Sequence, residues 1–276
     1  MKICIRPHDV GKATAQELGE KIHELGFDGV QLAIAKAIAG QNGSPETLTD
    51  AVIQEIRSGF NNNEVDIALL GAYFNPVHSN KQKVFDGQQK IMDHLKKAAK
   101  FGTKYVATES GSYNDDKWTY NPKNQTEEAF QEVKSVFIPV AQAAKEANAV
   151  FLIEGAWHHC MFKPQQLKRM VDELDNGHVC VTVDILNYLY IGNYQNREAI
   201  FQECLELFKD KIKVFHIKDF VIENDQIVEV EIGKGIMGWH KFLPIIKEKY
   251  PEAILVFEGV KNVPASLQFV KKVLYG

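Results

Sequence analysis

Four apolar runs in the second half of the chain each end on a side chain that could do chemistry. The runs cover residues 150–154, 179–184, 213–216 and 253–258, and they end on Glu154, Asp184, His216 and Glu258. Three carboxylates crowded into a partly apolar pocket repel one another, so at least one takes up a proton unless a cation is bound. A divalent metal ion resolves that conflict. Two Glu, one Asp and one His form an oxygen-dominated ligand set that suits Mn²⁺, Mg²⁺ or Co²⁺ and, less clearly, Zn²⁺.

Short β-branched runs alternate with helical patterns along the whole chain, which predicts strand-helix units on a parallel sheet. The predicted strands are residues 2–6, 29–33, 65–70, 104–108, 150–154, 179–184, 213–216 and 253–258. The predicted helices are residues 14–25, 45–58, 84–100, 127–147, 164–174, 197–208, 239–250 and 263–275.

Eight such units in 276 residues are typical of a single (β/α)8 TIM barrel, which takes about 250 residues. We therefore expect one α/β domain over residues 1–276. In a parallel barrel every strand ends at the same face, so the four polar strand ends should converge there. A doubly wound open sheet is the competing fold. However, the turn Pro7-His8-Asp9-Val10-Gly11 lacks the Gly-x-Gly-x-x-Gly pattern that binds dinucleotides.

Charge and hydropathy exclude two classes of partner. The formal charge is −4, whereas proteins that grip nucleic-acid phosphates need a surplus of Lys and Arg. The apolar stretch at the N-terminus is too short for a signal sequence, and no later run reaches membrane-spanning length. We therefore expect a cytoplasmic protein that binds neither nucleic acid nor membrane.

Four motifs together give the chain a specific resemblance over its whole length. It is similar to the xylose-isomerase-like TIM-barrel superfamily, which holds sugar isomerases and epimerases, dehydratases and endonuclease IV. The motifs are Glu154, Val183-Asp184-Ile185-Leu186-Asn187, His216-Ile217-Lys218-Asp219 with the later Gly233-Lys234-Gly235 and Trp239, and Phe257-Glu258-Gly259.

This resemblance implies a metal-dependent reaction at the four strand ends. In the epimerases of the superfamily, the residues that match Glu154, Asp184, His216 and Glu258 ligate one divalent cation, for which Mn²⁺ is our first expectation. The two glutamates also exchange protons with the sugar. The metal polarises the carbonyl and stabilises the enediolate that forms when a neighbouring C–H proton leaves.

Other loop residues are candidates for substrate binding, each with a structural alternative. The resemblance places His158 near substrate hydroxyls, although a surface loop histidine is an equal alternative, and Trp157 is the best aromatic pocket candidate. Asn187 could bond a hydroxyl or cap a turn, and Lys218 could reach a substrate oxygen or phosphate. Asp219 could orient His216, Glu109 could line the cavity or be solvated, and a structural role is favoured for His159.

The first functional hypothesis is a sugar, sugar phosphate or sugar acid isomerase or epimerase. The alternative is a dehydratase of a cyclic polyol or keto compound, because the same base and metal could expel a β-hydroxyl. An apurinic endonuclease ranks last, since endonuclease IV needs more zinc ions and histidines, and this chain has Gly71 and Asn187 at two such places. A non-catalytic sugar-binding barrel also stays open. The expected partner is a small sugar or polyol, and a homo-oligomer is one option for the assembly.

Overall fold

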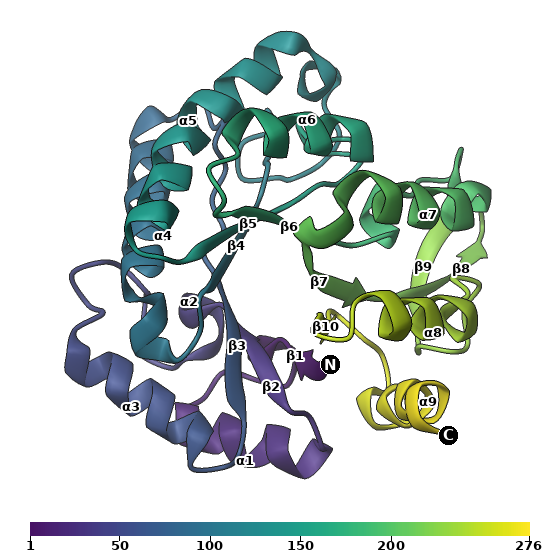
Figure 1. Cartoon of the computed structure of the whole chain (residues 1–276), viewed down its shortest axis with the longest axis horizontal. Helices are drawn as coiled ribbons and strands as arrows, with labels where there is room; N and C mark the ends of the chain where they lie inside the picture. The colour runs from purple at the N-terminus through teal and green to yellow at the C-terminus, as the bar shows by residue number, and fades with distance from the viewer.

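Eight parallel strands close into a barrel in the order β1-β10-β7-β6-β5-β4-β3-β2 (Figure 1). The computed structural model describes all residues 1–276. Because β1 pairs with β10, both ends of the chain belong to the same barrel. The barrel strands are β1 (Lys2–Ile5), β2 (Gly29–Leu32), β3 (Asp66–Gly71), β4 (Tyr105–Glu109), β5 (Val150–Glu154), β6 (Val179–Val183), β7 (Ile212–Ile217) and β10 (Ile254–Phe257). The predicted (β/α)8 barrel and all eight predicted strands are confirmed.

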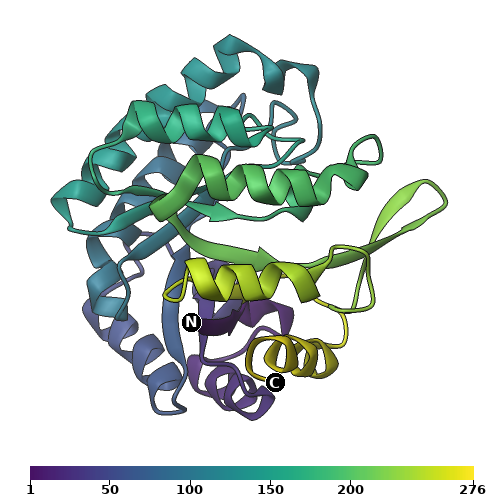
Figure 2. The ribbon, with the colours of Figure 1, turned by 45° about the vertical axis from the view of Figure 1, so that its right-hand side comes forward.

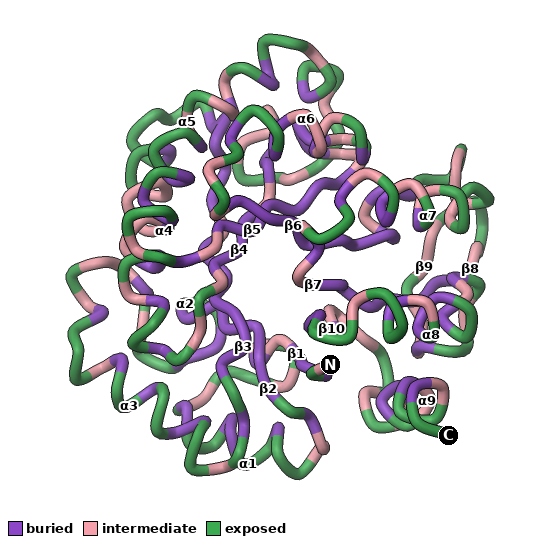
Figure 3. Tube along the Cα trace, in the orientation of Figure 1, coloured by how far each residue is buried: buried purple, intermediate pink, exposed green.

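Helices surround the barrel, with their exposed faces outward and their buried faces against the strands (Figure 3). They are α1 (Ala15–Leu25), α2 (Ile34–Ala37), α3 (Asp50–Asn61), α4 (Lys81–Phe101), α5 (Glu127–Glu146), α6 (Pro164–Leu174), α7 (Arg197–Phe208), α8 (Trp239–Lys249) and α9 (Val263–Tyr275). None of them is both long and apolar enough to cross a membrane.

Capping residues explain where two helices depart from their predicted starts. Helix α3 begins at Asp50 instead of residue 45, because Thr49 accepts a hydrogen bond from the Val52 amide. Helix α4 begins at Lys81 instead of residue 84, because the Asn80 side chain caps its first turn. The hydrophobic pattern locates both helices but does not resolve their first turns.

The barrel interior has an apolar layer beneath a charged one. Leu152, Val214 and Val256 belong to a compact cluster of nine buried residues. Side chains two residues apart on a strand share a face, so Glu154, His216 and Glu258 continue the same inward-facing rows. The apolar layer therefore supports the charged groups from below.

An antiparallel hairpin follows β7 and was not predicted. Strands β8 (Asp219–Glu223) and β9 (Gln226–Val230) pair with each other and project from the barrel (Figure 2). Asn224 and Asp225 form its turn with φ values of 49° and 57°, which is typical of a type I′ turn. The hairpin adds side chains to the face of the barrel where the strands end.

Candidate metal centre

The four predicted ligands meet at one point of the barrel mouth. Glu154 and His216 lie in β5 and β7, whereas Asp184 and Glu258 directly follow β6 and β10. One potential ligand atom from each of the four side chains lies within 4.8 Å of all the others. This cluster could bind a divalent metal ion.

His216 directs one ring nitrogen at the carboxylates. Its Nδ1 lies 2.6 Å from Glu258 Oε2, 3.3 Å from Glu154 Oε2 and 3.8 Å from Asp184 Oδ2. Nε2 donates to Gln31 Oε1 at 2.9 Å. Nδ1 of His216 and Oδ2 of Asp184 are buried, and they face only the charged groups of this cluster. One ring nitrogen and three carboxylates packed this closely are a donor set that fits a divalent cation.

Asp219 does not orient His216, so that expectation is wrong. Its carboxylate accepts hydrogen bonds from the backbone amides of Phe220, Gly233, Gly235 and Met237, at 2.9 to 3.2 Å. Gln31 orients the imidazole of His216 instead, and its side-chain Nε2 donates a hydrogen bond to the Tyr73 hydroxyl. Asp219 therefore anchors the loop that contains the Gly-x-Gly motif.

Two cations compensate the three carboxylates. Lys218 Nζ lies 3.0 Å from Asp184 Oδ2 and 3.0 Å from Glu258 Oε1. Arg6 Nη1 lies 2.8 Å from the same Glu258 oxygen. Asp9 holds the guanidinium in place by accepting from Nε at 2.9 Å and from Nη2 at 2.8 Å. Lys218 thus lies inside the charged cluster.

The two glutamates differ in their ionisation. Burial raises the pKa of Glu154. The charge of the neighbouring His216 acts in the opposite direction but does not cancel the rise. Burial also acts to raise the pKa of Glu258, but Lys218, His216 and Arg6 outweigh it and hold that pKa well below its ordinary value. For His216, burial is outweighed by Glu154 and Glu258, which raise its pKa to about 10. The site is therefore electrostatically asymmetric.

Asn187 connects the cluster to the neighbouring loops. Its side-chain amide donates to Glu154 Oε1 at 2.6 Å, and its Oδ1 accepts from Lys218 Nζ at 3.2 Å. Its backbone carbonyl accepts from the Trp157 amide at 2.8 Å. Asn187, Trp157 and His158 line one cavity of about 410 Å³, together with Glu229 of the hairpin. The structure therefore brings three of the predicted substrate-binding residues to one cavity beside the cluster.

Half-buried Glu109, at the end of β4, contacts the buried His159. Glu109 pairs in register with Glu154 on the next strand, and its Oε2 lies 3.2 Å from His159 Nδ1. Burial, and then the charge of Glu154, raise the pKa of Glu109 to about 8. His159 is 1% exposed. The raised pKa of Glu109 makes it the candidate proton donor at this edge of the site.

Sequence reasoning missed Arg6, Gln31 and Glu229. Two of them carried a usable signal, because Arg6 ends the first predicted strand and Gln31 is the polar residue in the apolar run Gly29-Val30-Gln31-Leu32. No sequence signal indicates Glu229, because it reaches the cavity only through strand β9 of the hairpin, which was not predicted.

Comparison with known proteins agrees with this fold. The sequence profile of the xylose isomerase-like TIM-barrel family matches residues 20–273, so the chain belongs to this family. No curated protein matches the sequence.

Several solved structures are similar to the chain over nearly its full length. A D-psicose 3-epimerase solved in the presence of D-fructose has a TM-score of 0.73 at 16% identity, covering 100% of both chains. A probable 3-DHS dehydratase from Bacillus anthracis also has a TM-score of 0.73, at 12% identity over 100% of this chain and 99% of the other. A xylose isomerase-like protein from Mycobacterium smegmatis in complex with magnesium has a TM-score of 0.76, at 12% identity over 99% and 97%. At these identities the likeness establishes the fold alone.

Proposed function

We propose that the protein is a divalent-metal-dependent isomerase or epimerase of a sugar, sugar phosphate or sugar acid, acting by proton transfer through an enediolate. The observation that carries this proposal is the convergence of Glu154, Asp184, His216 and Glu258 within 4.8 Å at the barrel mouth. Epimerases occur among the similar structures. A bound divalent ion, for which Mn²⁺ is our first choice, would polarise the substrate carbonyl and stabilise negative charge on the neighbouring oxygen.

Glu154 and Glu258 are the proposed proton-transfer groups. They come from β5 and the end of β10, which β6 and β7 separate in the barrel, so they approach a bound sugar from different directions. Asn187 holds one oxygen of Glu154, and Arg6 and Lys218 hold one oxygen of Glu258. These contacts hold both carboxylates in position before the substrate binds. Such prior orientation lowers the activation barrier of the proton transfer.

The remaining side chains of this region position the substrate in our proposal. His158 is half-buried, and burial lowers its pKa to about 4, so its neutral ring can both donate to and accept from a hydroxyl. Trp157 offers an apolar surface for sugar carbons, and the ammonium group of Lys218 can donate to a substrate oxygen.

A dehydratase is the second candidate, and Glu109 favours it. Loss of a hydroxyl needs an acid that protonates the leaving oxygen. Burial raises the pKa of Glu109 to about 8, and Glu109 pairs in register with Glu154, so it is the candidate acid for this step. A probable dehydratase is also among the similar structures.

A single screen separates the two chemistries. Purified protein loaded with Mn²⁺, Mg²⁺ or Co²⁺ is incubated in deuterium oxide with ketoses, their phosphates and inososes, and followed by NMR. The proposal predicts metal-dependent entry of deuterium at a carbon next to the carbonyl, together with the epimer or isomer. Formation of an unsaturated product supports the dehydratase. Absence of both reactions with every metal and substrate class contradicts an enzymatic role for this site.

A further inference from the structure

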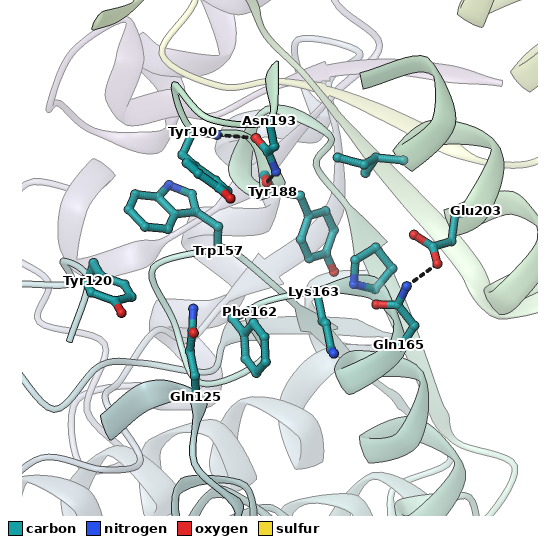
Figure 4. Close-up of a pocket in the computed structure, with 12 residues that line it drawn as sticks. Tyr120, Gln125, Trp157, Phe162, Lys163, Gln165, Tyr188, Tyr190, Asn193 and Glu203 are labelled. Atoms are coloured by element: carbon teal, nitrogen blue, oxygen red, sulfur yellow. Dashed lines mark hydrogen bonds between the residues drawn. The ribbon is translucent and has the colours of Figure 1, made fainter. Parts of the chain in front are cut away.

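A second cavity, of about 520 Å³, lies among the loops that follow β4, β5 and β6, and Trp157 and Tyr190 are among the residues that line it (Figure 4). We call it the outer cavity, and its lining includes Tyr120, Gln125, Trp157, Gln165, Tyr190 and Glu203. These residues come from the loops after β4, β5 and β6, the first turn of α6, and α7. Trp157 and Tyr190 also line the cavity of about 410 Å³ that contains Asn187 and His158. The two cavities thus share a wall.

The shared wall is aromatic and presents ring surface to solvent. Tyr120 stacks on Trp157 with a centroid distance of 5.4 Å and an interplanar angle of 18°. Tyr190 contacts Trp157 at 5.0 Å and 36°. Tyr120 and Tyr190 are nevertheless 44% and 42% exposed. Exposed aromatic faces carry partial negative charge and attract the weakly positive C–H groups of a sugar ring.

The polar groups of the outer cavity are suited to bind the hydroxyl groups of a ligand and not its charged groups. The Gln125 amide makes no hydrogen bond within the protein, and Gln165 uses only its Nε2, which donates to Glu203. A side-chain amide offers both donors and acceptors, as a hydroxyl does. Lys163 and Glu203 are the charged lining residues, and their opposite charges cancel. The lining therefore favours a neutral, hydroxyl-rich ligand over a phosphate or carboxylate.

We propose that the outer cavity binds a neutral pyranose ring joined by a glycosidic bond to the sugar that reacts at the metal centre. The substrate is then a glycoside or disaccharide, and the Trp157 and Tyr190 wall contacts both of its rings. The volume of about 520 Å³ lies in the range of small-molecule sites. This assignment of substrate class rests on the proposed function, although binding in the outer cavity does not.

Binding to metal-free protein tests the outer cavity without any turnover. The protein is treated with EDTA and titrated calorimetrically with cellobiose, maltose and lactose, and with methyl β-D-glucoside as the single-ring reference. Saturation-transfer NMR identifies the ring in contact with the protein. We expect at least one disaccharide to bind about tenfold more tightly than the glucoside, a difference of about 1.4 kcal/mol.

Two exposed positions provide variants that should not disturb folding. Tyr120→Ala removes the outer ring surface, and Gln165→Trp fills the cavity, so each should reduce the affinity for the disaccharide to that for the glucoside. Tyr275→Ala, which removes an exposed tyrosine from α9, is the matched control and should change nothing. Melting curves verify that all three variants fold. The inference is overturned if no disaccharide exceeds the glucoside, or if the advantage survives both variants.

The result distinguishes this inference from the proposed function. Tight binding of a disaccharide without hydrogen exchange on any sugar would contradict the proposed function and leave the outer cavity as a glycan-binding site. Hydrogen exchange on single sugars without any advantage for disaccharides would overturn the outer cavity alone.

Discussion

Glu154 and Glu258 are chemically alike, yet the protein surrounds them differently. Asn187, a neutral amide, holds one oxygen of Glu154, and Nδ1 of His216 lies 3.3 Å from the other. Arg6 and Lys218, both cations, contact one oxygen of Glu258, and the imidazole of His216 contacts the other. Since cationic partners lower the pKa of a carboxylate, Glu258 is the weaker base of the two. We propose that each glutamate nevertheless serves its own face of the sugar.

The Gln variants of the two glutamates test this division. An amide keeps the shape of the side chain but cannot accept a carbon-bound proton, so Glu154→Gln and Glu258→Gln should each lower kcat by about 100-fold or more. In deuterium oxide, each variant should still exchange the hydrogen of one epimer and fail with the other, because each face of the sugar has its own base.

Weaker metal binding could imitate this loss, so both variants are measured at saturating Mn²⁺. Retention of near-wild-type turnover and symmetric exchange in both would mean that the two-glutamate mechanism is wrong. A histidine such as His158 would then be the better candidate for the base.

The four candidate ligands could be predicted because strand ends of a parallel barrel converge, which requires only the strand boundaries. Their partners could not be predicted in the same way. Gln31 contacts His216 across 185 positions of sequence, and this contact depends on how the barrel closes. Arg6 reaches Glu258 only because β1 and β10 are neighbours.

At the level of elements, the loop after β9 depends on one buried carboxylate. Asp219 accepts four backbone amides, and a Cβ at Gly235 would lie 2.1 Å from its Oδ1 and 2.4 Å from the Phe220 carbonyl. Gly235→Ala must therefore break this arrangement, and we expect it to lower the free energy of unfolding by about 2 to 4 kcal/mol. Lys234→Ala, at the exposed residue between the two glycines, should change it by less than about 0.5 kcal/mol. Equal denaturant midpoints for the two variants would show that Asp219 does not fix the loop.

Helix α4 carries a buried histidine that makes stability depend on pH. Burial, reinforced by Lys90, lowers the pKa of His94 to about 4, and its Nδ1 donates to the Lys90 carbonyl at 2.9 Å. Between pH 6.5 and 4 the unfolded chain binds a proton at this residue that the folded chain does not, so stability falls as the pH falls. This loss amounts to about 2 kcal/mol by pH 5.

His94→Leu should remove that part of the acid sensitivity, because leucine does not titrate. Urea unfolding at pH 7 and pH 5 measures the difference between the variant and the wild type. Parallel losses of stability in the two proteins would show that His94 is not responsible.

The hairpin and the start of α3 mark the limit of prediction at this level. Strong hydrophobic periodicity located every barrel strand. Asn224-Asp225 between two alternating runs is a turn signal, but eight strands already complete a barrel, so the barrel pattern does not require the hairpin. Helix starts depend on single side-chain hydrogen bonds, such as that of Thr49, which hydrophobic periodicity does not register.

For the molecule as a whole, the formal charge of −4 bears on the endonuclease alternative. Binding to duplex DNA gains most of its free energy from neutralised phosphates, and this chain lacks the surplus of cations for that purpose. We expect no binding of an abasic-site duplex by fluorescence anisotropy at about 150 mM salt, and no cleavage. Cleavage that Glu154→Gln abolishes would overturn our ranking of functions.

The central claim is that Glu154, Asp184, His216 and Glu258 form one divalent-cation site, and metal titration tests it most directly. EDTA-treated protein is titrated with Mn²⁺ by calorimetry, alongside Asp184→Asn and the control Asp86→Asn on the exposed face of α4. We predict one site in the wild type and the control, with an affinity about 10- to 100-fold lower in Asp184→Asn, because one anionic ligand oxygen becomes neutral. Equal Mn²⁺ affinity in Asp184→Asn and the wild type would contradict the account.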